Sequence, residues 1–205
     1  MMHIRPSAAD LEGLVVEHER WSGSLGRLGR QLVLVDTDLA GVDLAGRDLG
    51  EAYLSGSRLV GARLDGAQLG RAMLIGADLG EASLIGAALG KADLSRARLV
   101  RARLGDANLT RAELDGADLR QANLVGATLV RAQLVDTDLR EADLTGALLE
   151  RTLLEGARLG GARLHGARGV DQVVLNGPIE TGPEEWRSGG DALDWLTRQA
   201  TEPVS

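Results

Sequence analysis

Leucine recurs at every fifth residue along most of the chain, from Leu34 to Leu164, without a break. The 27 repeats share a second apolar position, two residues before each leucine, which is alanine in 20 of them. The chain therefore repeats the pattern A-x-L-x-x, in which small and large apolar residues alternate at gaps of two and three.

This spacing excludes a regular helix and a straight strand. Five residues of an α-helix turn through about 500°, so the leucines would be spread around the whole helix surface. Side chains of a strand alternate between two faces, so successive leucines would point to opposite faces. Both apolar positions stay inside only if the chain is extended for about three residues, turns a corner in the next two, and repeats. The sequence predicts a coil wound around its own core.

Glycine is common where these corners fall. It stands two residues after the leucine in 13 of the 27 repeats, as in Gly41 and Gly46, and it readily adopts the positive φ of tight turns. With this pattern the sequence resembles the pentapeptide-repeat family, whose consensus is A-(D/N)-L-x-x. The resemblance covers residues 34–168 and implies an all-β fold, a right-handed, four-sided parallel β-helix of about seven coils. The residue before the leucine is Asp or Asn in only 10 repeats, but this position points outward, so the departure changes the surface and not the fold.

Residues 1–33 do not follow the repeat and are expected to form an N-terminal leader and helical cap. Ser7 and Asp10 have the spacing of a capping box, and apolar residues at helical intervals follow them. The predicted short amphipathic helix ends near Gly23. We expect it to cover the open end of the first coil, which would otherwise expose apolar residues and strand edges.

Residues 169–205 form a tail in which the repeat fades. Val174 and Ile179 keep the leucine spacing and predict one degenerate turn, and a second short helix is expected from Asp191. The tail has seven acidic and two basic residues, a net charge of −5. It has two interpretations, a helical cap on the last coil or a homodimer contact like those of some family members. The candidate contact residues for either are Trp186, Leu193, Trp195 and Leu196.

The candidate chemistry is sparse. Cysteine is absent, and the three histidines, His3, His18 and His165, show no spacing typical of metal ligands. A rod of filled coils offers no concave pocket, so we expect a protein that is not an enzyme and that uses no cofactor or metal. No signal peptide and no run of about 18 apolar residues is found, which favours a cytoplasmic protein.

The resemblance implies four repeats in each coil, so that residues 20 apart share a column. The acidic side, which holds Leu34 and Leu54, has a net charge of −5. It carries Arg96 and the candidate acidic interaction residues Asp36, Asp93, Glu113, Asp115, Asp136 and Glu155. The basic side, which holds Leu49 and Leu69, has a net charge of +4. Five of its cations share one corner at intervals of about 4.8 Å, and we name them the basic column: Arg71, Lys91, Arg111, Arg131 and Arg151.

The two other sides are close to neutral. The fourth side holds Leu44 and Leu64. The alternating side, which holds Leu39 and Leu59, carries opposite charges in successive coils, which should be mildly stabilising. This column is Asp38, Arg58, Asp78, Arg98 and Asp118.

The first functional hypothesis is a non-catalytic rod that binds a protein partner through a charged side. The resemblance extends to family members that protect DNA gyrase and topoisomerase IV from quinolones or toxins by imitating duplex DNA, which implies a type II topoisomerase bound by the acidic side. A duplex as long as the rod, about 32 Å, carries about 19 charges. Residues 34–168 have 19 acidic but also 17 basic residues, which argues against mimicry along the whole rod.

The alternative hypothesis is a binder of nucleic acid or another anionic partner. Stacked like charges repel one another, so an anion along the basic column would relieve that repulsion. Solvated arginines with counterions, aided by neighbouring carboxylates, are the simpler explanation of the column. A purely structural array unit is a third possibility, weakened because both ends are predicted to be capped.

Overall fold

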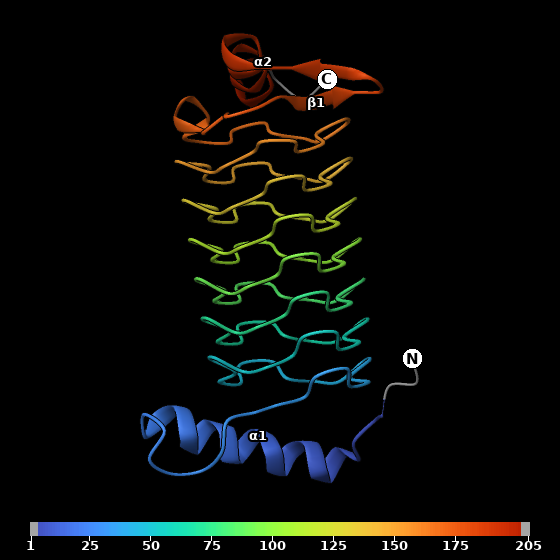
Figure 1. The fold of residues 1–205 in the computed structure, drawn as a ribbon, viewed down its shortest axis with the longest axis vertical. Coiled ribbons are helices and arrows are strands. Elements are labelled where there is room, and N and C mark those ends of the chain that lie inside the picture. Colours follow the sequence, from blue (N-terminus) through green and yellow to red (C-terminus); the bar gives the residue numbers. More distant parts are fainter. Residues whose placement is uncertain (1–3, 202–205) are drawn as a thin grey trace.

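The computed structural model describes residues 4–201, and its repeat region is a straight stack of similar coils (Figure 1). From Val33 to Leu148, isolated parallel β-bridges join each residue before a leucine to the residue 20 positions later, as Asp38 to Arg58 and Arg58 to Asp78. Four pentapeptides therefore complete one turn, and the predicted β-helix solenoid is confirmed.

The core is built from the two constant positions of the repeat. None of the 27 repeat leucines is more than 6 % exposed, and the alanines beside them are buried as well. The backbone hydrogen bonds run along the axis of the rod, as in the bond from Leu89 N–H to the Asn108 carbonyl at 2.8 Å. Each leucine is thus both a core residue and a point where two coils are joined.

A few hydroxyl residues replace alanine in the core, and their polar groups are satisfied. Thr137 and Thr152 are fully buried, and their hydroxyls donate to the carbonyls of Leu114 and Leu129, each at 2.8 Å. A buried hydroxyl is tolerated when it is hydrogen-bonded, so the repeat accepts these residues without opening the core.

Every corner of the coil has a left-handed backbone. The residue two positions after each leucine has positive φ throughout the repeat region, whether it is glycine or not, and the non-glycine residues there have φ of 50–60°. This conformation costs an L-residue about 1–2 kcal/mol, and glycine escapes most of that cost. Residues such as Arg111 are therefore held in a strained conformation by the coil around them.

Helix α1 (Ala8–Gly23) lies across the N-terminal end of the coil (Figure 1). Ser7 is its N-cap, and its hydroxyl oxygen accepts the Asp10 N–H at 3.1 Å, as the capping box predicted. Leu11 and Val15 face the first coil and belong to the same buried cluster as the repeat leucines.

Polar contacts attach this helix to the first coil. Arg47 replaces a core alanine and reaches Glu19 at 2.7 Å and Glu12 at 2.8 Å. The hydrogen bond from Arg47 holds the pKa of Glu19 below its usual value. His18 is fully buried, and its Nδ1 accepts the Leu32 N–H at 2.9 Å. Burial lowers the pKa of His18, which favours the neutral imidazole that this bond requires.

The repeat ends with a change of register. The short 3-10 helix η1 (Val170–Gln172) inserts an extra residue, so Val174 pairs with Leu153, 21 residues earlier. The predicted degenerate turn is present, but Val174 occupies an exposed bridge position instead of a leucine position. Ile179 is fully buried, but a second extra residue aligns it with Ala157, so it occupies the alanine column instead of the leucine column.

The chain then forms a hairpin and a helix at the C-terminal end. Strands β1 (Ile179–Gly182) and β2 (Glu185–Arg187) are antiparallel, and helix α2 (Gly189–Thr201) follows them. The carbonyl of Ala200 accepts the Gly166 N–H at 2.8 Å, which attaches α2 to the last regular coil. Neither α1 nor α2, the two α-helices between residues 4 and 201, has the length and apolar character needed to cross a membrane.

The left-handed corners predict an unusual order of stabilities at Arg111. Arg111→Gly should be more stable than Arg111→Ala by about 1 kcal/mol, because only glycine adopts positive φ without strain. Urea denaturation measures the difference. The neighbouring Thr110 is the control, since it lacks positive φ. Thr110→Gly should be less stable than Thr110→Ala, and the same order at both positions would contradict the strain argument.

The depressed pKa of Glu19 predicts an acid-sensitive attachment of α1. A carboxylate whose pKa is lower in the folded state stabilises the fold above its unfolded pKa, about 4.3, and this contribution is lost as the pH falls through the folded pKa. Glu19→Gln should be less stable than the parent protein at pH 7 and should lose less stability between pH 5 and pH 3. Urea midpoints at several pH values test this, with Glu81→Gln as the control that should leave the profile unchanged.

Candidate functional site

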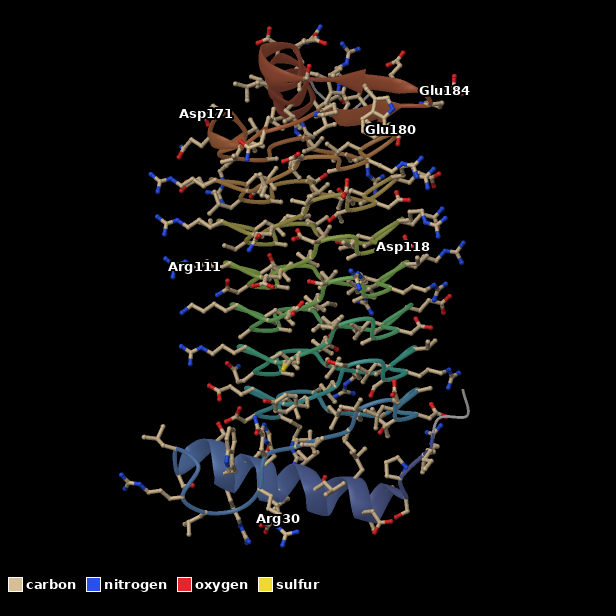
Figure 2. All side chains as sticks on the ribbon, viewed as in Figure 1. Arg30, Arg111, Asp118, Asp171, Glu180 and Glu184 are labelled. Carbon is tan, nitrogen blue, oxygen red and sulfur yellow. The ribbon has the colours of Figure 1, made fainter. Side chains whose placement is uncertain are left out.

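The charged sides of the rod are the candidate site. Nowhere in residues 4–201 do three or more histidine or acidic side chains come together in a way that could hold a metal ion. The side chains point outward from successive coils, with Arg111 at one edge of the view and Asp118 toward the other (Figure 2).

The predicted acidic residues do not form one continuous surface. Asp36 lies in the first coil, and glycine occupies its corner in the next two coils, at Gly56 and Gly76. The other five predicted residues lie in four successive coils, from Asp93 to Glu155. We name them the acidic patch: Asp93, Glu113, Asp115, Asp136 and Glu155.

Carboxylates of the acidic patch are placed by the backbone and not neutralised. Asp93 accepts the Ser95 N–H at 2.9 Å, and Asp115 accepts the Val135 N–H at 3.0 Å. Asp93 and Glu113 are direct bridge partners, so two like charges stand side by side. No member of the patch forms an ion pair with another described residue. The patch therefore keeps its negative charge available to a partner.

The N-terminal half of the acidic side is apolar, a feature that sequence reasoning missed. Val33 is 61 % exposed and Tyr53 is 37 % exposed, and both pair in one column with Met73. The signal was in the sequence, because these residues stand before a leucine, where the family consensus has Asp or Asn. The acidic side thus joins an apolar strip to the acidic patch along one column.

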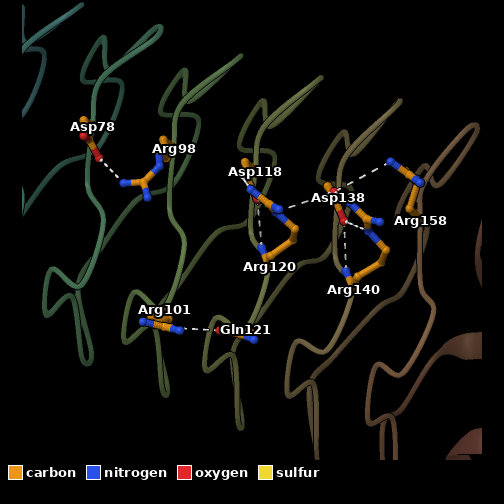
Figure 3. Close-up of polar contacts among 9 residues, drawn as sticks. All are labelled: Asp78, Arg98, Arg101, Asp118, Arg120, Gln121, Asp138, Arg140 and Arg158. Atoms are coloured by element: carbon orange, nitrogen blue, oxygen red, sulfur yellow. Dashed lines mark hydrogen bonds and ion pairs between the residues drawn. The ribbon is translucent and has the colours of Figure 1, made fainter.

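The alternating side neutralises its own charges (Figure 3). Arg98 pairs at 3.1 Å with Asp78 of the adjacent coil, which confirms the predicted pairing of opposite charges. Arg120 instead pairs with Asp118 at 2.7 Å, two residues earlier in the same coil, a contact that was not predicted. Hydrogen bonds from Arg120 hold the pKa of Asp118 below its usual value, so this carboxylate stays charged well into the acid range.

Asp138 is the centre of a network on the same side (Figure 3). It binds Arg140 at 2.5 Å and lies 3.8 Å from Arg120 and 3.9 Å from Arg158. Arg158 also pairs with the nearly buried carboxylate of Glu180 in β1. The network joins the hairpin to the coil and uses its charges internally.

The basic column lies at the corner between the basic side and the acidic side, as the order of repeats requires. All five of its residues are exposed. Arg71 approaches Glu51 at 3.3 Å, and both side chains are largely in solvent. The other four form no ion pair within residues 4–201.

The candidate contacts of the tail fall into two groups. Leu196 is fully buried, and Trp195 packs against the core with part of its surface covered. Leu193 is half-buried. Trp186, on β2, is 53 % exposed and is left out of that packing.

Comparisons with known proteins agree with this architecture. The family model for Pentapeptide repeats matches in eight copies, over residues 37–74, 62–99, 102–140 and 132–168. No curated protein matches the chain.

Several solved structures are similar to this chain. HetL, a pentapeptide repeat protein involved in heterocyst differentiation regulation from the cyanobacterium Nostoc sp. strain PCC 7120, is 28% identical over 80% of this chain and 96% of its own, with a TM-score of 0.37. QnrB1, a plasmid-mediated fluoroquinolone resistance protein, is 18% identical over 82% and 95%, with a TM-score of 0.47. A pentapeptide repeat protein from the Arabidopsis thaliana thylakoid lumen is 22% identical over 77% and 88%, with a TM-score of 0.31.

The matched residues coincide with the coil described above. They cover well over half of the chain, and the leucines that define the copies are the buried leucines of the core. The chain belongs to the pentapeptide-repeat family.

Proposed function

We propose that the chain is a non-catalytic interaction rod that binds a protein partner through its acidic side, and that this partner is a type II topoisomerase, DNA gyrase or topoisomerase IV. The observation that carries the proposal is the acidic patch. Its five carboxylates lie in four successive coils of a rigid backbone and are not used in ion pairs within the described residues.

The charge density of the patch is comparable with that of a short piece of DNA. The four coils span about 14 Å, a length over which duplex DNA carries about eight phosphate charges. The patch has five carboxylates over this length and Arg96 on the same side. It can therefore imitate part of one DNA strand, while the rod as a whole cannot imitate a duplex. A protein surface that holds DNA phosphates with Arg and Lys would pair with these carboxylates in the same way.

The apolar strip beside the patch favours a protein partner. Stable protein interfaces have an apolar core surrounded by polar contacts. Val33, Tyr53 and Met73 lie in the same column as Asp93, toward the N-terminal end. A partner that contacts both parts would gain apolar burial from the strip and electrostatic steering from the patch.

A second part of the proposal concerns the two ends. We propose that α1 and α2 cap the coil, because each contributes buried residues, such as Val15 and Leu196, against its end. Trp186 remains exposed on β2, a short strand that pairs with β1 alone in the part of the chain that the structure describes. These features make the tail the proposed homodimer contact.

The topoisomerase proposal predicts inhibition or protection in a gyrase supercoiling assay, run with and without a fluoroquinolone. The triple variant Glu113→Gln, Asp136→Asn, Glu155→Gln should weaken the effect by at least about tenfold, because three carboxylates that pair with the partner are neutralised. Within residues 4–201 the side chains of these three residues accept no hydrogen bond from a backbone N–H, so the fold should be retained.

The matched control also removes three negative charges, but from another part of the rod. Glu51→Gln, Glu81→Gln, Glu141→Gln alters three corner residues outside the acidic side and should leave the gyrase effect within about twofold of the parent. If the parent protein gives no inhibition, no protection and no binding to gyrase or topoisomerase IV at micromolar concentration, the topoisomerase proposal is wrong.

The tail proposal predicts a dimer that depends on Trp186. Sedimentation velocity should show the parent protein as a dimer at micromolar concentration and Trp186→Arg as a monomer, since a charge in place of an exposed aromatic anchor opposes association. Circular dichroism should be the same for both. A monomeric parent protein, or a variant that still dimerises, would contradict the assignment.

A further inference from the structure

The basic column has two energetic costs, and beyond Arg71 no ion pair within the described residues offsets them. Each of its residues has φ of 57–60°, the conformation in which glycine is preferred. Successive cations also stand in adjacent coils, at intervals of about 4.8 Å, where like charges repel. Both costs recur in five coils without interruption.

The other corners of the same coil show that these costs are avoidable. On the fourth side the equivalent corner is glycine in six of seven coils, as in Gly86 and Gly126. On the alternating side, Arg101 donates to Gln121 at 2.8 Å (Figure 3). Gln121 in turn donates to Glu141 at 2.7 Å. Glycine thus avoids the backbone strain at the corner of the fourth side. At the corner of the alternating side, side chains of successive coils bind one another.

In the basic column, Arg71 pairs with Glu51 of the coil before it, but the other four residues use neither solution. Lys91, Arg111, Arg131 and Arg151 are exposed and have no ion pair or side-chain hydrogen bond in the part of the chain that the structure describes. Arg111 extends away from the rod into solvent (Figure 2). An anionic partner would offset the repulsion that the free protein leaves in place.

The surface next to the column indicates the chemistry of that partner. The basic side beyond the column is uncharged over its central coils. Apart from Val130, it is made there of small or polar residues, among them Ala88, Gly90, Asn108, Thr110 and Thr128. A protein interface needs an apolar core, and binding of single-stranded nucleic acid relies on aromatic stacking. Neither is offered here, whereas contacts to the phosphates of a duplex need only cations and hydrogen-bond donors.

The dimensions of the column fit the same partner. Its five residues span about 19 Å, and the major groove of duplex DNA is about 12 Å wide. Laid across the groove, the column reaches phosphates on both rims. The carboxylates of the acidic patch lie around the corner, so a duplex approaches from the basic side without meeting them.

We propose that the basic column binds the phosphate backbone of duplex nucleic acid without reading its sequence. This site is separate from the acidic patch and takes a different ligand. Four of its five cations are arginines, which hold phosphate oxygens in a bidentate manner.

Fluorescence anisotropy with a labelled duplex DNA of about 30 base pairs tests the proposal, since non-specific binding is expected in the range of about 10⁻⁴ to 10⁻⁶ M. The logarithm of the binding constant should fall with the logarithm of salt with a slope of about −4, for four to five phosphate contacts. Arg111→Glu, Arg131→Glu should weaken binding at least about tenfold and lower the slope. Glutamate already occupies corners of this type at Glu51 and Glu81, so the variant should fold.

The control is Arg63→Glu, Arg103→Glu on the fourth side, which makes the same change in net charge and should have a much smaller effect. Equal losses from the two double variants would overturn the proposal, because only net charge would then matter. It would also be overturned by a single-stranded oligonucleotide or polyglutamate that binds more tightly than the duplex at the same salt.

The triple variant of the acidic patch separates this proposal from the topoisomerase proposal. Glu113→Gln, Asp136→Asn, Glu155→Gln should bind the duplex as well as the parent protein or more tightly, because repelling carboxylates are removed. Loss of duplex binding in that variant would place the DNA contact on the acidic side and contradict the assignment to the basic column.

Discussion

The structure depends on one constraint, the burial of a leucine at every fifth residue while the backbone hydrogen bonds run along the rod. An extended stretch of about three residues satisfies both requirements only if a corner follows it. Four such corners close a coil of 20 residues, and the bridges place each coil directly above the one before. The interior is then uniform, so differences in sequence appear almost entirely on the outer surface.

This constraint also determines how the surface is organised. A residue at a given position of the repeat belongs to a column with a spacing of about 4.8 Å, and its side chain cannot move to another side. The corner residue is in addition forced to positive φ, whatever its type. A glycine corner therefore has little backbone strain. A corner such as Arg111 or Gln121 carries a side chain at the cost of a strained backbone.

The coil and its leucine core could be predicted from sequence because one period governs 135 residues. The resemblance to the family added the four sides, and with them the alignment of the basic column. What could not be predicted depends on contacts outside that period. Arg47 pairs with Glu12 and Glu19 only because α1 lies across the first coil. Arg120 bonds to Asp118 within its own coil, although the column pattern paired Asp118 with Arg98 in the coil before.

The end of the repeat could be predicted only in part, again because it depends on structure outside the five-residue period. Spacing alone kept Val174 in the leucine column, but the 3-10 helix η1 adds a residue, and the chain pairs one position later. The break follows Gly169, the first residue of a leucine column that is not leucine. Without that side chain, no buried anchor fixes the following residues to the five-residue period.

The acidic patch and the basic column meet at one corner of the coil, and the rigidity of the backbone keeps them apart. Asp93 follows Lys91 by two residues, yet the two side chains form no ion pair within residues 4–201, because the corner directs them to different sides. On a flexible surface such charges would pair and neutralise each other. Here each remains available to its own ligand, and a ligand that binds a preset row of charges loses little entropy in ordering it. The burial of leucine inside the coil is thus the physical reason that opposite charges can serve separate partners outside it.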